Sequence, residues 1–280
     1  MEYVLGLYEK AMPIGLTWRE MLEACRDTGY DQLEISIDET DVRQARLNWT
    51  RKERTLLKKV SADTGVPIAT MCLSGHRKYP LGSHYPELRN RSLHIMRQAI
   101  DLACDLGIRV IQLAGYDVYY EDSDDETKAW FEENLFRCVE YASRQGVPLG
   151  FETMETPFMD TISKSMACVA KINSAYLGIY PDLGNLTNAC KQYGTTVTEE
   201  IHFGVGHLLA MHLKETLPGK YRDMDFGKGH VDFASGIQDA AACGINMFTA
   251  EFWYDGGIGW KERLKHTNHF LRSRFPTAPF

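Results

Sequence analysis

The sequence predicts an α/β protein, a (β/α)8 TIM barrel in which residues 1–280 form a single domain. Eight short apolar runs alternate with helix-like segments, and eight is the number of parallel strands that closes such a barrel. The runs begin 28–43 residues apart, which is the length of one βα unit. A doubly wound open sheet is the alternative, but the segment "LGLYEKAMPIG" at the first run lacks the GxGxxG pattern expected there.

Each apolar run is an expected strand, because it is short and is followed by a helix-like pattern. Between the runs, Thr17 is the expected N-cap of a helix, and Glu20 completes a capping box. Gly107 and Gly146 are expected to end two longer helices, since glycine is the usual residue after a helix C-terminus. The expected strands are Tyr3–Tyr8, Asp31–Ile37, Pro67–Leu73, Val110–Tyr116, Leu149–Met154, Leu177–Leu183, Leu208–Lys214 and Phe248–Trp253.

Composition restricts the classes of function. The net charge is -7, which disfavours binding to nucleic acid because such proteins usually present a basic surface. No run of 18 apolar residues and no signal peptide is found, so we expect no membrane partner. The seven cysteines form no CxxC pair and are interpreted as reduced residues of a cytoplasmic protein.

Four consecutive expected strands carry a metal-ligating side chain near their carboxyl ends. Glu152 lies in "LGFETM", Asp182 in "YPDLGN", His212 in "MHLKE" and Glu251 in "TAEFWY". Any one of these residues alone is more often a helix cap, a surface group or a packed histidine. Together they lie at the rim where TIM barrels hold their active sites, on strands about 4.8 Å apart. We therefore expect the four side chains to meet.

A cluster of three carboxylates and one imidazole needs a cation to offset the repulsion between its negative charges. Oxygen-rich ligation with one imidazole suits Mn²⁺ or Mg²⁺ and is compatible with Zn²⁺ or Co²⁺. The expected cofactor is therefore one divalent metal ion, and the donor set differs from that of a closed structural zinc site.

Other polar residues follow the same strands and are candidates for binding a substrate. The glycines around Lys228 in "RDMDFGKGHVDF" could free backbone N–H groups for an anion, and Arg77 with Lys78 is a second anion candidate. Each of these residues could equally be an ordinary loop residue. The remaining candidates are Lys10, His76, Tyr116, Asn185 and Lys214.

Several sequence motifs, spread from Tyr3 to about Trp253, resemble those of one known protein family. The segments "ISIDETD", "MCLSGHRKYPLGS", "VIQLAGYDVYY", "YPDLGNL" and "GVGHLLAMHLKET" together resemble the L-ribulose-5-phosphate 3-epimerases, which are also called L-xylulose-5-phosphate 3-epimerases. That family belongs to the xylose isomerase-like barrels. The segments "VIQLAGYDVYY" and "CLSGHRKYPLGS" are typical of this group, whereas the four-ligand pattern marks the wider superfamily.

The resemblance implies one metal ion held by Glu152, Asp182, His212 and Glu251, with Glu152 and Glu251 as the acid and base. It also implies a substrate contact three residues after the metal-binding Asp, where related ketose epimerases often have His and this chain has Asn185. A basic residue that follows the metal-binding His in these relatives falls near Arg222. The implied partner is a small sugar phosphate, and a homodimer is possible.

The implied reaction is epimerisation of a ketopentose 5-phosphate at carbon 3, from L-xylulose 5-phosphate to L-ribulose 5-phosphate. One glutamate would remove the proton next to the carbonyl, and the other would return a proton to the opposite face. A divalent ion would stabilise the intervening enediolate. Both glutamates are expected at the barrel mouth, where they could lie on either side of a substrate.

Three other functions remain open from the sequence. An aldose–ketose (hexulose-phosphate) isomerase would transfer a hydride between two metals. A metal-dependent endonuclease of the same fold would need a basic surface and further ligands, which the charge of -7 disfavours. A sugar-phosphate-binding protein without activity would not need both glutamates.

Overall fold

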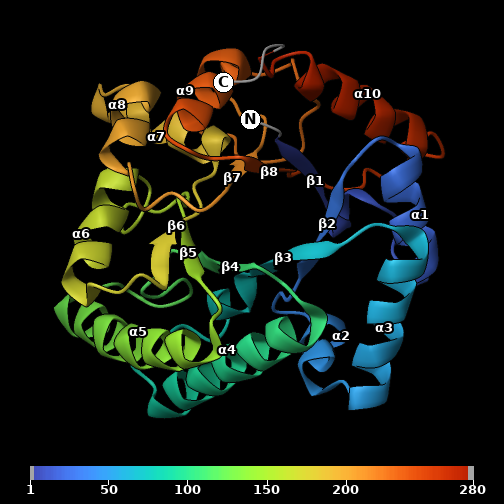
Figure 1. Ribbon diagram of the computed structural model, residues 1–280. Helices are drawn as coiled ribbons and strands as arrows, with labels where there is room; N and C mark the ends of the chain where they lie inside the picture. Colours follow the sequence, from blue (N-terminus) through green and yellow to red (C-terminus); the bar gives the residue numbers. More distant parts are fainter. Residues whose placement is uncertain (1–2, 277–280) are drawn as a thin grey trace.

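The computed structural model describes residues 3–276, so parts of the expected 1–280 domain, residues 1–2 and 277–280, lie outside the description. The eight expected strands are confirmed, and they form one parallel sheet at the centre of the molecule, surrounded by helices (Figure 1). Their bounds are β1 (Val4–Tyr8), β2 (Gln32–Ser36), β3 (Ile68–Leu73), β4 (Val110–Ala114), β5 (Leu149–Glu152), β6 (Leu177–Ile179), β7 (Met211–Leu213) and β8 (Met247–Ala250).

The sheet curls into a barrel in the order β6-β5-β4-β3-β2-β1-β8-β7. Between β6 and β7 the regular ladder is replaced by isolated bridges. The N–H of Leu209 donates to the carbonyl of Ile179 at 2.9 Å, and the N–H of His212 donates to the carbonyl of Pro181 at 2.9 Å. These bonds close the barrel, so the expected (β/α)8 fold is confirmed.

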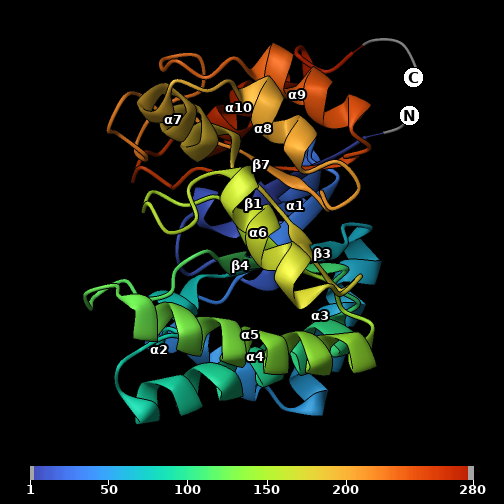
Figure 2. The same ribbon diagram turned by 90° about the vertical axis from the view of Figure 1, so that its left-hand side faces the viewer.

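An outer layer of helices covers the strands on all sides (Figure 1). Figure 2 shows the same layer from the side, with α4 and α5 packed beside each other. The helices are α1 (Trp18–Asp27), α2 (Asp41–Gln44), α3 (Arg51–Thr64), α4 (Pro86–Leu106), α5 (Asp125–Gln145), α6 (Ile162–Ile172), α7 (Leu183–Tyr193), α8 (Val197–Phe203), α9 (Phe233–Ala242) and α10 (Trp260–Arg272), with 3-10 turns at Glu9–Ala11, Ala45–Asn48 and Ser74–Arg77.

The helix boundaries follow local sequence signals. Thr17 caps α1, and its side chain and that of Glu20 form the expected capping box. Gly107 and Gly146 end α4 and α5 with φ angles of 79° and 74°, in the left-handed region that favours glycine. These turns bring the chain directly back into the next strand.

Six strands end one to four residues earlier than the sequence predicts, and the differences are largest for the sixth and the eighth strand. The sixth run was expected to extend to Leu183, but β6 ends at Ile179 because Pro181 has no N–H for a ladder and Asp182 becomes the N-cap of α7. The last expected strand extended to Trp253, whereas β8 ends at Ala250. Asp182 and Glu251 therefore lie just beyond their strands, at the rim of the barrel.

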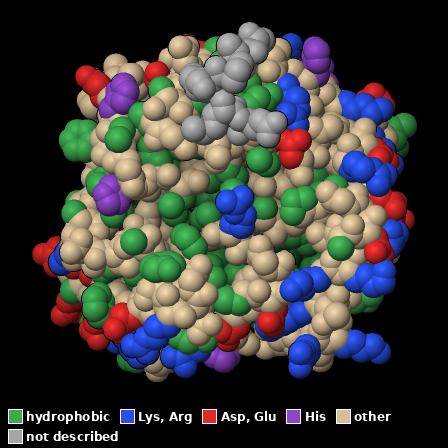
Figure 3. Space-filling model, viewed as in Figure 1, with side chains coloured by type: hydrophobic (Ala, Val, Ile, Leu, Met, Phe, Trp, Pro, Cys, Tyr) green, Lys and Arg blue, Asp and Glu red, His purple; other side chains and the backbone are tan. Residues whose placement is uncertain are grey.

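The main hydrophobic core lies between the strands and the surrounding helices. The strand residues are buried on both faces of the sheet, apart from the half-buried Val4. Seen along the barrel axis, most charged side chains lie toward the periphery, and the centre of this face is mainly hydrophobic, with a Lys or Arg side chain near its middle (Figure 3). Within residues 3–276, no helix is long and apolar enough to cross a lipid bilayer.

Candidate metal centre and substrate cavity

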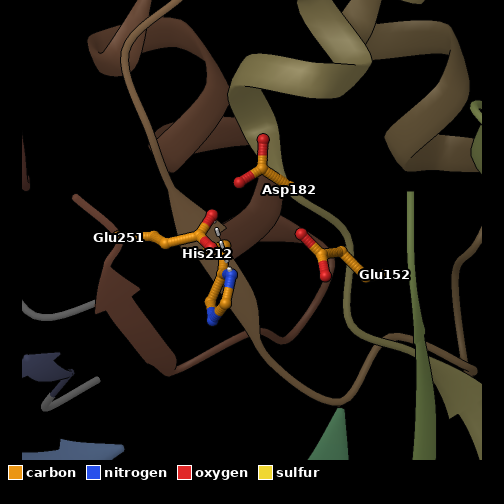
Figure 4. Close-up of side chains that lie close together, drawn as sticks. All are labelled: Glu152, Asp182, His212 and Glu251. Atoms are coloured by element: carbon orange, nitrogen blue, oxygen red, sulfur yellow. Dashed lines mark ion pairs between the residues drawn. The ribbon is translucent and has the colours of Figure 1, made fainter. Parts of the chain in front are cut away.

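The four side chains expected to meet do so at the rim of the barrel. Each of Glu152, Asp182, His212 and Glu251 offers one ligand atom, and these atoms all lie within 4.8 Å of one another. Figure 4 shows the two glutamates approaching from opposite sides, with Asp182 and His212 between them. All four residues are buried. The spatial juxtaposition predicted from the strand spacing is thus present.

Backbone contacts between neighbouring strands hold these residues in place. Glu152 ends β5 and pairs with Ala114 of β4. Asp182 forms a bridge with His212, which lies in the middle of β7. The N–H of Glu251 donates to a carbonyl of β7, that of Leu213, at 2.9 Å. The four positions are therefore fixed by the barrel itself.

The donor set fits a divalent cation. Asp182 Oδ2 and Glu251 Oε2 are buried and accept no hydrogen bond within the described part of the chain. Buried carboxylate oxygens that accept no hydrogen bond are costly, and a bound cation would satisfy them. Lys214 Nζ, 3.2 Å from each of these oxygens, supplies one positive charge. One lysine leaves three carboxylates under-neutralised, so the cluster could bind a metal.

The pKa values of the three carboxyl groups in the cluster differ, because burial and neighbouring charges affect each group differently. Burial, followed by the charge of Glu251, raises the pKa of Glu152 to about 8. Burial also raises the pKa of Asp182, to about 6. Burial acts in the same direction on Glu251, but Lys214 and His212 outweigh it and hold the pKa of Glu251 well below its ordinary value. Without a cation, the cluster would therefore retain protons near neutral pH.

The imidazole of His212 contacts carboxylates through both ring nitrogens. Its Nε2 atom lies 2.6 Å from Glu34 Oε1, and its Nδ1 atom lies 3.4 Å from Glu251 Oε2. Gln112 Nε2 lies 3.0 Å from the same Nδ1. Burial lowers the pKa of His212, but the charges of Glu34 and Glu251 outweigh burial and raise it. Nδ1 can bind a cation only after it has lost any proton and its contact with Gln112.

Glu34 also belongs to this site, although it is not among the residues predicted from the sequence. The residue lies within β2, in the run "DQLEISI", and is fully buried. A charged residue inside an apolar strand is the same signal that identified Glu152. Glu34 lies deeper in the barrel than the rim, however, and the sequence predicts functional residues only at the rim.

A cavity opens over the cluster, and Glu152 and Glu251 line it. It includes four of the seven candidate substrate-binding residues, Lys10, Asn185, Lys214 and Arg222. Of the second anion candidate, Arg77 lines the cavity as well, together with aromatic rings and Glu155, whereas Lys78 is exposed and lies outside the lining. The cavity walls are therefore rich in positive charge close to buried carboxylates, which suits a small polar anion.

The basic residues of the cavity are partly neutralised by nearby carboxylates. Lys10 Nζ lies 2.6 Å from Asp38 Oδ2. Arg222 lies 3.8 Å from Glu155 and 5.3 Å above the centre of the Trp253 ring. The Arg222 side chain is exposed at 42%, so it can still move toward a ligand.

Three candidate residues lie away from the cavity lining. The turn at Ser74–Arg77 directs Ser74 and Arg77 into the cavity, whereas the buried ring of His76 has its Nε2 atom 3.3 Å from the carbonyl of Ser92 on α4. Burial lowers the pKa of His76 to about 4. His76, a candidate from the sequence, therefore points away from the cavity and packs against α4.

Tyr116 and Lys228 are the other two residues outside the lining. The buried hydroxyl of Tyr116 donates to Glu155 at 2.7 Å and lies 3.4 Å from Arg77, so Tyr116 supports two residues that do line the cavity. Lys228 is exposed. The neighbouring N–H of Gly227 already donates to Glu215 at 2.8 Å and is not free for an anion.

A closed parallel barrel with this cluster at its rim defines the class of xylose isomerase-like barrel enzymes. A sequence model of the xylose isomerase-like TIM barrel family matches residues 22–274. The chain is 41% identical over 277 residues to the L-ribulose-5-phosphate 3-epimerase UlaE of Salmonella paratyphi C, and the match covers 98% of this chain and 95% of that protein. It belongs to the L-ribulose-5-phosphate 3-epimerase family.

Solved structures of other sugar epimerases share the fold. An L-ribulose 3-epimerase superimposes with a TM-score of 0.74 at 18% identity, covering 98% of this chain and 96% of that one. A D-psicose 3-epimerase gives a TM-score of 0.78 at 15% identity, covering 96% and 98%. These similarities show the fold, and the family membership makes the protein an isomerase of the sugar epimerase class.

Proposed function

We propose that the protein interconverts L-xylulose 5-phosphate and L-ribulose 5-phosphate by inverting carbon 3. The observation that carries the proposal is the placement of Glu152 and Glu251, which approach the cluster from opposite sides and line one cavity (Figure 4). Inversion next to a carbonyl requires two proton carriers on opposite faces of the carbon. The full-length similarity to L-ribulose-5-phosphate 3-epimerases supports the choice of sugar.

The residues that would hold the metal ion are Glu152, Asp182, His212 and Glu251. A bound divalent ion would supply Lewis-acid polarisation of the substrate carbonyl and favour the negative charge that develops on its oxygen. Lys214, 3.2 Å from both Asp182 and Glu251, adds a fixed positive charge beside the reacting atoms. Carboxylate and ammonium groups would thus lie beside the reacting carbon of a substrate bound over the cluster.

One glutamate takes the proton from carbon 3, and the electron pair of the broken C–H bond moves toward the carbonyl oxygen. The other glutamate then delivers a proton to the opposite face of carbon 3, and the carbonyl forms again. The reverse direction exchanges the two roles. Each properly placed acid or base contributes about 10²–10⁴-fold to the rate.

The phosphate of the substrate is proposed to bind at the basic side of the cavity. Arg77 and Arg222 both line it, and a guanidinium can bind a phosphate through two parallel hydrogen bonds. Lys10 is already paired with Asp38 and is a weaker candidate. Asn185 lines the same cavity and can contact a sugar hydroxyl.

The direct test is an assay of the purified protein on a panel of pentulose and hexulose phosphates. The panel is run with Mn²⁺, Mg²⁺, Zn²⁺ or Co²⁺ and after treatment with EDTA. We expect conversion between L-xylulose 5-phosphate and L-ribulose 5-phosphate that depends on the added metal. Conversion of ketose to aldose phosphates instead, or full activity after removal of all metal, would contradict the proposal.

A further inference from the structure

A buried carboxylate in the barrel interior, outside the cavity, contacts His212 of the cluster. Glu34 is fully buried in the middle of β2 and does not belong to the cavity lining. An ionised carboxylate inside a protein is costly unless it is paired and hydrogen-bonded. Its presence in the barrel interior therefore calls for a function that an apolar residue could not perform.

Both oxygens of Glu34 have fixed partners. Its Oε1 atom lies 2.6 Å from Nε2 of His212. Its Oε2 atom accepts hydrogen bonds from the hydroxyls of Thr70, at 2.7 Å, and Tyr180, at 3.0 Å. The Tyr180 hydroxyl is in turn 2.9 Å from that of Thr249. Because the two hydroxyl donors occupy one oxygen, the other oxygen is directed at the imidazole.

The backbone of β2 also changes at this residue. The pairing of β2 with β3 shifts register between Leu33 and Glu34, and Glu34 then pairs with Thr70. Irregularities of this kind re-aim a side chain and are frequent next to active sites. The shift places Glu34 beside the hydroxyl that holds its carboxylate.

A carboxylate that accepts from Nε2–H fixes the orientation of the ring. The proton then stays on Nε2, and the lone pair is on Nδ1, which faces Glu251 (Figure 4) and can bind a cation once its contact with Gln112 Nε2, at 3.0 Å, is broken. Carboxylates placed in this way behind a histidine raise its basicity as a ligand, and their loss typically weakens metal affinity about 10–100-fold.

We propose that Glu34 is a positioning residue, which holds His212 in the Nε2–H tautomer so that Nδ1 is the cation ligand. The proposal rests on the metal site of the proposed function, although it does not depend on which sugar is the substrate. Thr70 and Tyr180 act one step further away, since they direct the carboxylate of Glu34.

The test compares metal binding by the full-length protein and its variants after EDTA treatment. Glu34→Gln keeps the size of the side chain and removes its charge. We expect the affinity for Mn²⁺, measured by titration calorimetry, to fall about 10–100-fold. The visible spectrum of the Co²⁺-loaded protein should also change, because the spectrum reports on the ligands. Thr249→Val is the matched control, since it removes a buried hydroxyl of the same network that does not touch Glu34, and Mn²⁺ affinity should be retained.

Tyr180→Phe provides a second variant if Glu34→Gln fails to fold. It removes one hydrogen bond to Glu34 and leaves the contact with His212, so we expect a smaller loss of Mn²⁺ affinity in the same direction. A purely structural role would lower the melting temperature of both variants and leave Mn²⁺ affinity and the Co²⁺ spectrum unchanged, which would overturn the proposal. If Glu34→Gln weakens Mn²⁺ binding while the unmodified protein epimerises no ketose phosphate, the role of Glu34 is supported and the proposed reaction fails.

Discussion

The carboxylate of Asp182 accepts the backbone N–H of Asn185 through Oδ1 at 2.6 Å, which makes Asp182 the N-cap of α7. Its other oxygen, Oδ2, faces the cluster and accepts no hydrogen bond within the described residues. One oxygen of Asp182 therefore caps helix α7, and the other is free to serve as a metal ligand. The two tasks can be separated by mutation.

Asp182→Asn should retain the cap and lose the anionic ligand, because an amide oxygen can still accept the N–H of Asn185. We expect the melting temperature of the metal-depleted protein to change little and the Mn²⁺ affinity to fall strongly. Asp182→Ala removes the cap as well and should cost about 1 kcal/mol of further stability. Thermal unfolding and calorimetry measure the two effects. Equal stability of both variants would show that the cap contributes nothing.

Glu152→Gln and Glu251→Gln should each reduce kcat by at least about 10²–10⁴-fold while the protein stays folded, since each removes a proton carrier. Glu133→Gln, an exposed position on α5, is the matched control and should keep full activity. Steady-state rates and circular dichroism check both expectations. Near-native turnover in either cluster variant would remove that glutamate from the acid–base pair.

Metal binding should depend on pH because the cation competes with a proton on Glu152. With a pKa of about 8 without metal, this carboxyl is mostly protonated at pH 7, so Mn²⁺ affinity should rise as the pH increases through about 8. Calorimetry in buffers of different ionisation enthalpy would detect the released protons. Binding without proton release at pH 7 would contradict this expectation.

The raised pKa of Glu152 also predicts how the stability of the metal-free protein depends on pH. The pKa of Glu152 lies above its ordinary value of 4.5, so the folded state holds the proton more tightly than the unfolded chain. Its stabilising contribution is fully present below pH 4.5 and is lost as the pH rises through about 8. Glu152→Gln should therefore flatten the fall in melting temperature of the EDTA-treated protein between these pH values.

Arg222→Ala should raise KM for a ketose phosphate more than it lowers kcat, because Arg222 lines the cavity without touching the cluster. The KM for the unphosphorylated sugar should change far less. Lys228→Ala removes an exposed charge of the same loop that does not line the cavity and should leave both substrates unaffected. The comparison identifies the phosphate-binding residue. A larger effect of Lys228→Ala would restore the anion site predicted from the glycines around it.

The fold and the cluster could be predicted because strand alternation and the position of a strand end are local properties of the sequence. Glu152, Asp182, His212 and Glu251 were found in this way, and the structure brings them together. Side-chain direction within a turn is not local information, so the sequence does not show that Arg77 lines the cavity whereas His76 points away from it.

The contact between Glu34 and His212 spans 178 residues and crosses the barrel interior. The run "DQLEISI" does not indicate which residue pairs with Glu34, although a charge within an apolar strand indicates that a partner exists. For Lys228 the sequence predicts an anion site that the structure does not offer. The backbone N–H of Gly227, in the same glycine-rich loop, already donates to Glu215.

The most direct test of proton transfer by the two glutamates is NMR of the products formed in D₂O. We expect both ketose phosphates to acquire solvent deuterium at carbon 3, because the proton removed by one glutamate is replaced from the other. Epimerised product without deuterium at carbon 3 would contradict transfer between the two glutamates and the solvent. Aldose product without deuterium would indicate a hydride shift instead.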